Sequence, residues 1–122
     1  MSRQQALNWI DNNTLTGIRA GTDRERFLDI WMVSVDGRIF ARSWGLSERS
    51  WYTAFHQDPI GAIRCGEQVF AVRAHIPEDL EALTPRINQA YLDKYTSEHN
   101  RPYAEGIVRK EHAAHTMELL LV

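Results

Sequence analysis

The dipeptide Asp36-Gly37 lies between two runs that are rich in β-branched and aromatic residues, 27–35 and 38–43. Asp-Gly is a strong signal for a two-residue hairpin loop, because both residues tolerate the positive φ angles that such a tight turn needs. The loop fixes the pairing across the hairpin, which is Val35 with Arg38, Val33 with Phe40 and Trp31 with Arg42. Both faces of this hairpin are largely apolar, which favours a small barrel or a sheet covered by helices.

The remaining strands are predicted from similar signals. A second hairpin is expected over 60–65 and 68–76, with a type II′ loop at Gly66-Glu67. Weak alternation predicts a strand over 14–20, and the apolar run 116–122 predicts another at the C-terminus. A short strand is expected at 107–110. The segment 22–27 is ambiguous, since Thr22-x-x-Glu25 fits a capping box while the following residues favour a strand, and we favour the strand.

Helices are expected in three places. Apolar residues at helical spacing predict a first helix at 3–12. Ser47 or Ser50 can cap a second helix, which ends near Gln57 because Asp58-Pro59 stops it. A third helical region opens at Pro77 and restarts at Thr84-Pro85, and the polar segment 97–106 is expected to be a loop. Hairpins outnumber long crossovers, so the pattern predicts an α+β, mainly antiparallel fold.

Length and composition limit the classes of function. The chain has 122 residues, which suits one domain over 1–122 that begins with the helix inside 1–13. The net charge of −2 disfavours a nucleic-acid or membrane-surface partner. No apolar run approaches the roughly 20 residues of a membrane span. The single cysteine, Cys65, excludes an internal disulfide, and we expect a cytoplasmic protein.

The segment 42–52 is the most informative part of the chain for function. It combines arginines, serines, a glycine and aromatic residues between a strand and a helix. Arg42 and Arg49 could grip a phosphate, and Trp44 or Trp51 could stack on a flat ring. The alternative is that Trp51 and Phe55 belong to the core and that the arginines are solvated.

Other chemical motifs are weak or missing. The sequence contains no dinucleotide fingerprint, phosphate-binding loop or nucleophile elbow. His112 and His115 are expected to be surface histidines, because no third metal ligand accompanies them, and no metal site is predicted. Cys65 beside His56 or His75 is better explained as a packed thiol than as a nucleophile.

Several segments resemble a bacterial family catalogued as domain of unknown function 2255. They are IWMVSVDGRIFARSWG, the following SWY, IRCGEQVFAV, INQAYLDKY and HAAHTMELLLV, so that the likeness covers about residues 15–122. That family is grouped with the FMN-binding split-barrel proteins, which include pyridoxamine-phosphate-oxidase-like enzymes and deazaflavin-dependent reductases. The resemblance implies a six-stranded antiparallel split barrel with flanking short helices, in a homodimer.

The resemblance also implies a site and a cofactor. The cofactor would be FMN or a deazaflavin coenzyme, and the activity would be hydride transfer to a small-molecule substrate. The residues implied to bind it are Arg42, Ser43, Trp44, Gly45, Arg49, Trp51 and Tyr52. Basic residues expected on the preceding strand of flavin oxidases are matched only by Arg26, which leaves open a cofactor-free barrel that binds a small ligand or a protein.

Two further points stay open at the level of the sequence. Tyr52 or Tyr95 could donate a proton in such a reaction. Haem binding occurs in related barrels, but none of the five histidines stands in a context that favours it; these are His56, His75, His99, His112 and His115.

Overall fold

The computed structural model describes residues 2–47 and 49–122. Within them, the strands form one antiparallel sheet in the order β2-β1-β5-β6-β7-β4-β3. The strands are β1 (Thr16–Ala20), β2 (Leu28–Ile30), β3 (Val33–Val35), β4 (Arg38–Arg42), β5 (Ile60–Cys65), β6 (Gln68–His75) and β7 (Thr116–Leu121). The predicted α+β, mainly antiparallel class is confirmed.

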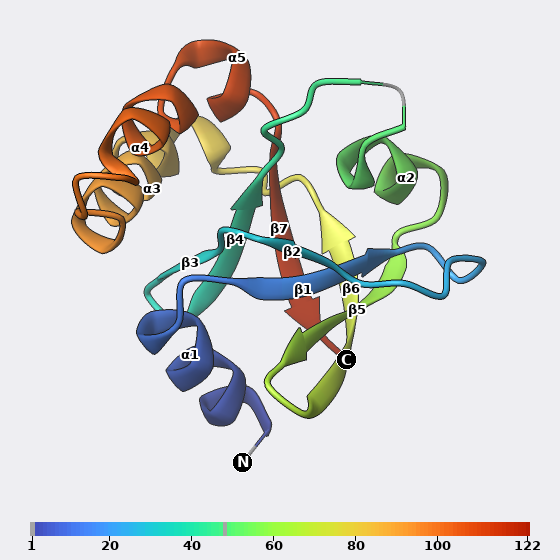
Figure 1. The fold of residues 1–122 in the computed structure, drawn as a ribbon. Helices are drawn as coiled ribbons and strands as arrows, with labels where there is room; N and C mark the ends of the chain where they lie inside the picture. Colours follow the sequence, from blue (N-terminus) through green and yellow to red (C-terminus); the bar gives the residue numbers. More distant parts are fainter. Residues whose placement is uncertain (1, 48) are drawn as a thin grey trace.

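The sheet is closed by the chain itself. β2 and β3 form its two opposite edges, yet only Trp31 and Met32 separate them in the sequence. Because two residues join the edges, the sheet must curl back on itself, and it does so as the half-open barrel in Figure 1. β2 and β3 are the two parts of one predicted strand, so the predicted six strands appear as seven segments of the same split barrel.

The first hairpin has the predicted turn and register. Asp36 and Gly37 have φ angles of 54° and 75°, and Val35 pairs with Arg38 and Val33 with Phe40. The predicted pairing of Trp31 with Arg42 is wrong, because the β3–β4 ladder ends at Val33–Phe40.

The ladder ends there because helix α3 takes over the backbone groups of Met32. The Met32 N–H donates to the hydroxyl of Tyr95 at 3.1 Å, and its carbonyl accepts from Lys94. These bonds replace the strand pairing that the sequence predicts. At the second hairpin, Gly66 has φ 66° and is the only residue of its loop in the left-handed region, as expected for type II′.

The helices lie around the barrel in two groups. They are α1 (Ser2–Asn12), α2 (Trp51–Gln57), α3 (Leu80–Lys94), α4 (Arg101–Ile107) and α5 (Lys110–Ala113). In Figure 1, α3 and α4 lie together on one side of the barrel and α2 lies on the other. One apolar cluster fills the barrel and includes Met32, Ile39 and Phe55, and a second packs α3 and α4 against β3 and β4.

Three predictions about the helical region are wrong. Helix α3 does not restart at Thr84-Pro85, and Pro85 lies inside one continuous helix. Leu83, Ile87 and Tyr91 are buried along its inner face, and this packing offsets the hydrogen bond that the proline removes. The predicted loop 97–106 and strand 107–110 are replaced by α4 and α5, since Pro102 suits a first helical turn.

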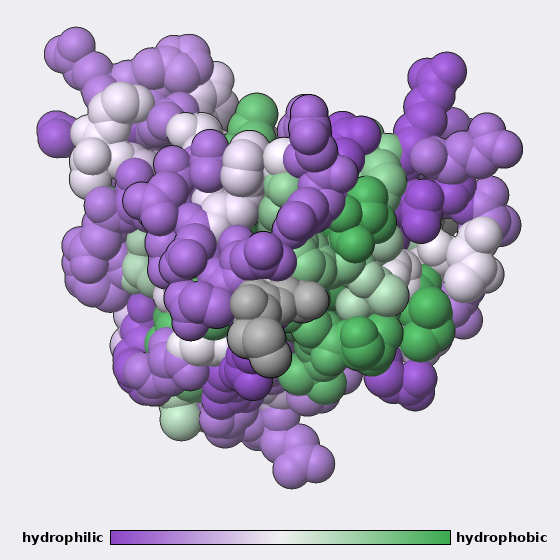
Figure 2. Space-filling view, turned by 90° about the horizontal axis from the view of Figure 1, so that it is seen from below, coloured by the Kyte–Doolittle hydropathy of each residue, from purple (hydrophilic) through white to green (hydrophobic). Residues whose placement is uncertain are grey.

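One face of the molecule carries an apolar area. Figure 2 shows apolar side chains gathered on the underside of the molecule. The exposed apolar residues on the outer side of β6 and β7 are Val69, Leu120 and Val122, the last 77% exposed. No helix in the described ranges, 2–47 and 49–122, is long and apolar enough to cross a bilayer.

Candidate functional site

A cleft of about 520 Å³ opens where the end of β4 faces α4. One wall is formed by β2 and Trp31, and another by residues 43–45, 47, 49 and 50 with the first residue of α2. The turn before α4 and α4 itself supply the rest, through His99, Asn100, Tyr103 and Ile107. Six of the seven residues predicted to bind a cofactor line this cleft, namely Arg42, Ser43, Trp44, Gly45, Arg49 and Trp51.

Arg42 is a buried cation with neutral partners. Only 3% of the residue is exposed. Its Nε donates to Thr116 Oγ1 at 3.0 Å, and its Nη1 donates to Asn88 Oδ1 and to the Ile107 carbonyl. Its Nη2 is buried and has no hydrogen-bond partner among the described residues. A buried cation needs an anion or several acceptors. Three of the five N–H groups of this guanidinium are bonded, and the two on Nη2 are left without an acceptor.

The ionisation of Arg42 is consistent with that description. Burial lowers the pKa of its guanidinium, which nevertheless stays protonated at neutral pH. The guanidinium also lies 5.5 Å from the centroid of the Tyr91 ring, and the hydroxyl of Tyr91 accepts the Arg42 backbone N–H. The positive charge is therefore fixed in place by α3.

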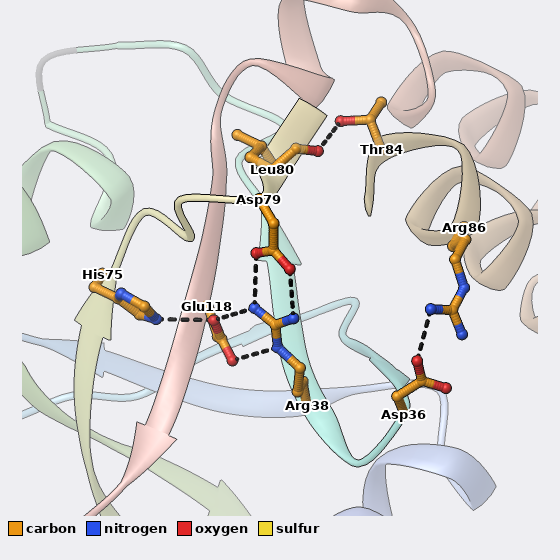
Figure 3. Close-up of polar contacts among 8 residues, drawn as sticks. All are labelled: Asp36, Arg38, His75, Asp79, Leu80, Thr84, Arg86 and Glu118. Atoms are coloured by element: carbon orange, nitrogen blue, oxygen red, sulfur yellow. Dashed lines mark hydrogen bonds and ion pairs between the residues drawn. The ribbon is translucent and has the colours of Figure 1, made fainter. Parts of the chain in front are cut away.

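Arg38 lies on the same strand as Arg42 but is paired with carboxylates of the protein. Its guanidinium forms a bidentate bond with Glu118 at 2.9 Å and contacts both carboxylate oxygens of Asp79 (Figure 3). The charge of Arg38 is thus neutralised by the protein itself, whereas none of the ion pairs among the described residues includes Arg42. β4 therefore carries one arginine that is neutralised by carboxylates and one, Arg42, that has no ion pair among the described residues. The carboxylate of Asp29 also lines the cleft, and it lies 3.9 Å from Nη2 of Arg64.

The loop after β4 is held by α4 and α5. The Ser43 hydroxyl donates to the Gly45 carbonyl at 2.7 Å, and the Ser43 carbonyl contacts Nδ1 of His112. Trp44 stacks on the ring of His112 at 4.8 Å. A Cβ on Gly106 would lie 2.7 Å from the Trp44 ring, so only glycine lets this ring pack against α4. Ser43 and Trp44 therefore shape the cleft, and the polar groups of Ser43 are bonded within the protein.

Of the two residues at the start of α2 that are predicted to bind a cofactor, only Trp51 lines the cleft. Ser50 caps the helix, since its hydroxyl accepts the N–H of Thr53 at 3.2 Å. Trp51 is buried in the barrel core and also lines the cleft. Tyr52 is buried but does not line the cleft, and its hydroxyl contacts the Ala114 carbonyl at 3.5 Å. The structure therefore places Tyr52 apart from the other predicted residues.

The sequence predicts the wall of the cleft that follows β4, but it does not predict the walls formed by Trp31 and by α4. Trp31, Asn100 and Tyr103 line the cleft, whereas the sequence predicts only a strand and a loop at these positions. The sequence Asn100-Arg101-Pro102 could have revealed α4, because asparagine and proline are both favoured at a helix start. Nothing local marks Asn88 and Thr116 as partners of Arg42, since they lie 46 and 74 residues further along the chain.

Tyr95 and Cys65 lie outside the cleft. The hydroxyl of Tyr95 donates to the Thr14 carbonyl at 2.8 Å, and burial raises its pKa. Burial also raises the pKa of the Cys65 thiol, to about 11. The described ranges, 2–47 and 49–122, hold no group of three or more histidine, cysteine or acidic residues that could bind a metal.

The family can be assigned at this point. Residues 5–119 match the family described as an uncharacterized protein conserved in bacteria, DUF2255. The chain belongs to the DUF2255 family. The segments that resemble this family in the sequence include the hairpin at Asp36-Gly37 and the residues Arg42 to Gly45, which line the cleft of this DUF2255 protein. No curated protein matches the chain.

Solved structures support the split-barrel fold of this DUF2255 member. A conserved hypothetical protein of Mycobacterium tuberculosis matches with a TM-score of 0.62 and 18% identity, over 98% of this chain and 78% of that one. A candidate pyridoxamine 5′-phosphate oxidase of Listeria innocua matches with a TM-score of 0.59 and 9% identity, over 100% and 93%. An FAD-binding protein of Mesorhizobium loti matches with a TM-score of 0.56 and 11% identity, over 99% and 88%. At these identities the likeness concerns the fold.

Proposed function

We propose that this protein binds a flavin-type coenzyme, FMN or a deazaflavin, in the cleft and transfers hydride to a small substrate. The observation that carries the proposal is Arg42, a cation buried in the cleft wall whose Nη2 has no partner among the described residues. A phosphate oxygen at this atom would complete its hydrogen bonds and neutralise its charge. Two solved structures with the same fold are named for a flavin or for a pyridoxamine phosphate oxidase.

The other residues of the cleft suit such a molecule. Its volume of about 520 Å³ lies within the roughly 300–1,000 Å³ of small-molecule sites. Arg24 and Arg49 add positive charge at exposed positions, while Trp31, Trp51 and Tyr103 provide aromatic walls for a flat ring. The residues therefore offer a cationic end for a phosphate and aromatic walls for a ring in one space.

The chain's own residues would bind and orient the coenzyme. The coenzyme, when bound, supplies the hydride chemistry. Arg42 would fix its phosphate, and the wall between Trp31 and Trp51 would fix its ring and exclude water. Tyr52 and Tyr95 do not line the cleft, so neither serves as the proton donor in this proposal.

Titration of the purified protein with FMN and with a deazaflavin tests the proposal. Arg42→Met and Arg49→Ala should each weaken binding by about 1.5–3 kcal/mol, the usual contribution of a hydrogen bond to a charged group. Arg73→Ala is the matched control, because Arg73 is exposed on β6 and does not line the cleft. Equal dissociation constants for all four proteins, or no binding of either coenzyme, would refute the proposal.

A second candidate function is a binding module without a cofactor. Its supporting observation is that neither tyrosine considered as a proton donor reaches the cleft. In that case the same cleft would bind an anionic aromatic ligand without reducing or oxidising it. A protein that binds FMN but shows no change in flavin absorbance with reductant and a panel of acceptors would favour this function.

We also propose that the protein is a homodimer. The apolar residues Val69, Leu120 and Val122 on the outer side of β6 and β7 are exposed, and a second copy could cover them. Sedimentation of the purified protein at micromolar concentration tests this, and a single monomer boundary would contradict it.

A further inference from the structure

A second, smaller hollow adjoins the cleft. It has a volume of about 260 Å³ and is formed by the end of α1 with the residues that follow, 11–14, and by the end of α3 with the residues that follow, 94–97. Asn100 lines both the hollow and the cleft. The two spaces therefore meet at the side of this one residue.

A pair of stacked rings forms the partition between them. Trp31 lines the cleft and Tyr95 lines the hollow, and their rings are parallel within 4° with centroids 3.7 Å apart. Tyr95 is fixed by bonds to the Thr14 carbonyl and to the N–H of Met32. A ligand that extends from the cleft into the hollow must therefore pass Asn100.

The groups around the hollow have unused hydrogen-bonding capacity. The side-chain amide of Asn100 makes no hydrogen bond with the described residues, although its backbone N–H is bonded to Ser97. Lys94 has three N–H donors, and two of them are bonded to the neutral carbonyls of Ile10 and Met32. The carboxylate of Asp11 lies in the same lining and accepts from Ser34.

This mixture defines the class of group that the hollow can bind. A lone phosphate would face Asp11 as well as Lys94, so strong preference for a bare anion is not expected. Sugar hydroxyls both donate and accept, and they match amide, hydroxyl, ammonium and carboxylate groups together. The hollow is thus suited to a hydroxyl-bearing segment.

The spacing sets the length of such a ligand. Asn88, which holds Arg42, and Lys94 are six residues apart on α3, which corresponds to about 9 Å along the helix axis. A ligand that contacts both Arg42 and Lys94 must span this distance, which is longer than the single phosphate ester group of a mononucleotide.

We infer that the ligand of the cleft is a dinucleotide-type molecule whose second, sugar-bearing half lies in the hollow past Asn100. This inference rests on the proposed function, since the first phosphate of the ligand is the one placed at Arg42.

The test compares a mononucleotide with a dinucleotide that has the same ring. The probes are FMN and FAD, or 5-deaza-FMN and 5-deaza-FAD if only the deazaflavin ring binds. The dinucleotide should bind about tenfold more tightly, which corresponds to about 1.4 kcal/mol.

Thr14→Leu and Thr96→Leu narrow the hollow at exposed positions that line it, and neither side chain makes a hydrogen bond among the described residues. Each should remove the preference and leave mononucleotide binding within twofold.

Gln68→Leu is the matched control, because it adds the same side chain at an exposed position on β6, away from the hollow. Equal affinity for both probes in the unmodified protein overturns the inference while leaving the proposed function in place. A preference that survives in both leucine variants also overturns it. Absence of binding by every probe overturns the proposed function and this inference together.

Discussion

We expect Asn88→Asp to stabilise the protein and to weaken its binding of the ligand. Asn88 Oδ1 accepts a hydrogen bond from Nη1 of Arg42, and aspartate has nearly the same shape as asparagine. The substitution supplies the carboxylate that Arg42 otherwise lacks. A hydrogen bond between charged groups contributes about 1.5–3 kcal/mol, against about 0.5–1.5 kcal/mol for a neutral acceptor. We therefore expect a gain of about 1 kcal/mol, or about 3–5 °C in Tm for a domain of this size.

The same carboxylate should compete with a phosphate for Arg42. Loss of one charge-assisted bond to the ligand corresponds to about a tenfold to hundredfold increase in the dissociation constant for FMN or the deazaflavin. Calorimetric unfolding and fluorescence titration of the same preparation measure the two effects. Gln68→Glu is the control, because it adds a negative charge at an exposed position outside the cleft. A variant that is more stable but binds as tightly as the unmodified protein would refute the assignment of Arg42 to the ligand.

Three further predictions concern the fold and its assembly. Gly61→Ala should destabilise the protein by about 1–3 kcal/mol in thermal unfolding, because its Cβ would overlap the Arg19 carbonyl and the Phe55 ring. Gly45→Ala, whose Cβ meets no atom within 4 Å, should change stability by less than about 0.5 kcal/mol. Burial acts to raise the pKa of Glu118, but hydrogen bonds from Arg38 and His75 outweigh it and lower that pKa. The stability from this group is therefore present above the unfolded pKa of about 4.3 and lost as the pH falls through the folded value. Glu118→Gln should lower stability at pH 7 and flatten its decline below about pH 5, whereas a parallel decline in both proteins would contradict this. Leu120→Glu should convert the proposed dimer to a monomer in sedimentation and remove the dependence of Tm on protein concentration, and an unchanged boundary would place the interface elsewhere.

The parts of the fold that local residues determine were predictable. The turn at Asp36-Gly37 needs only two residues that tolerate positive φ, and the register beside it follows from the loop length. The break between β2 and β3 was not predictable, because Trp31 and Met32 continue the apolar pattern. Side chains of Lys94 and Tyr95, more than 60 residues away, take the backbone groups of Met32.

One wall of the site could also be predicted from the sequence, and the opposite wall could not. The cluster of arginine, serine and tryptophan in 42–52 marks one wall of the cleft, and the structure brings most of it together. The burial of Arg42 depends on Asn88 and Thr116, which only the folded chain brings close. The opposite wall was missed because α4 buries little more than Ala104 and Ile107, so its sequence has the polarity of a loop.

A crystal structure of the protein with bound FMN or deazaflavin tests the central claim most directly. We predict a phosphate oxygen about 2.7–2.9 Å from Arg42 Nη2, with the ring between Trp31 and Trp51. A phosphate bound elsewhere, or a carboxylate of the protein itself at Nη2, would contradict the claim that this buried cation is reserved for a ligand.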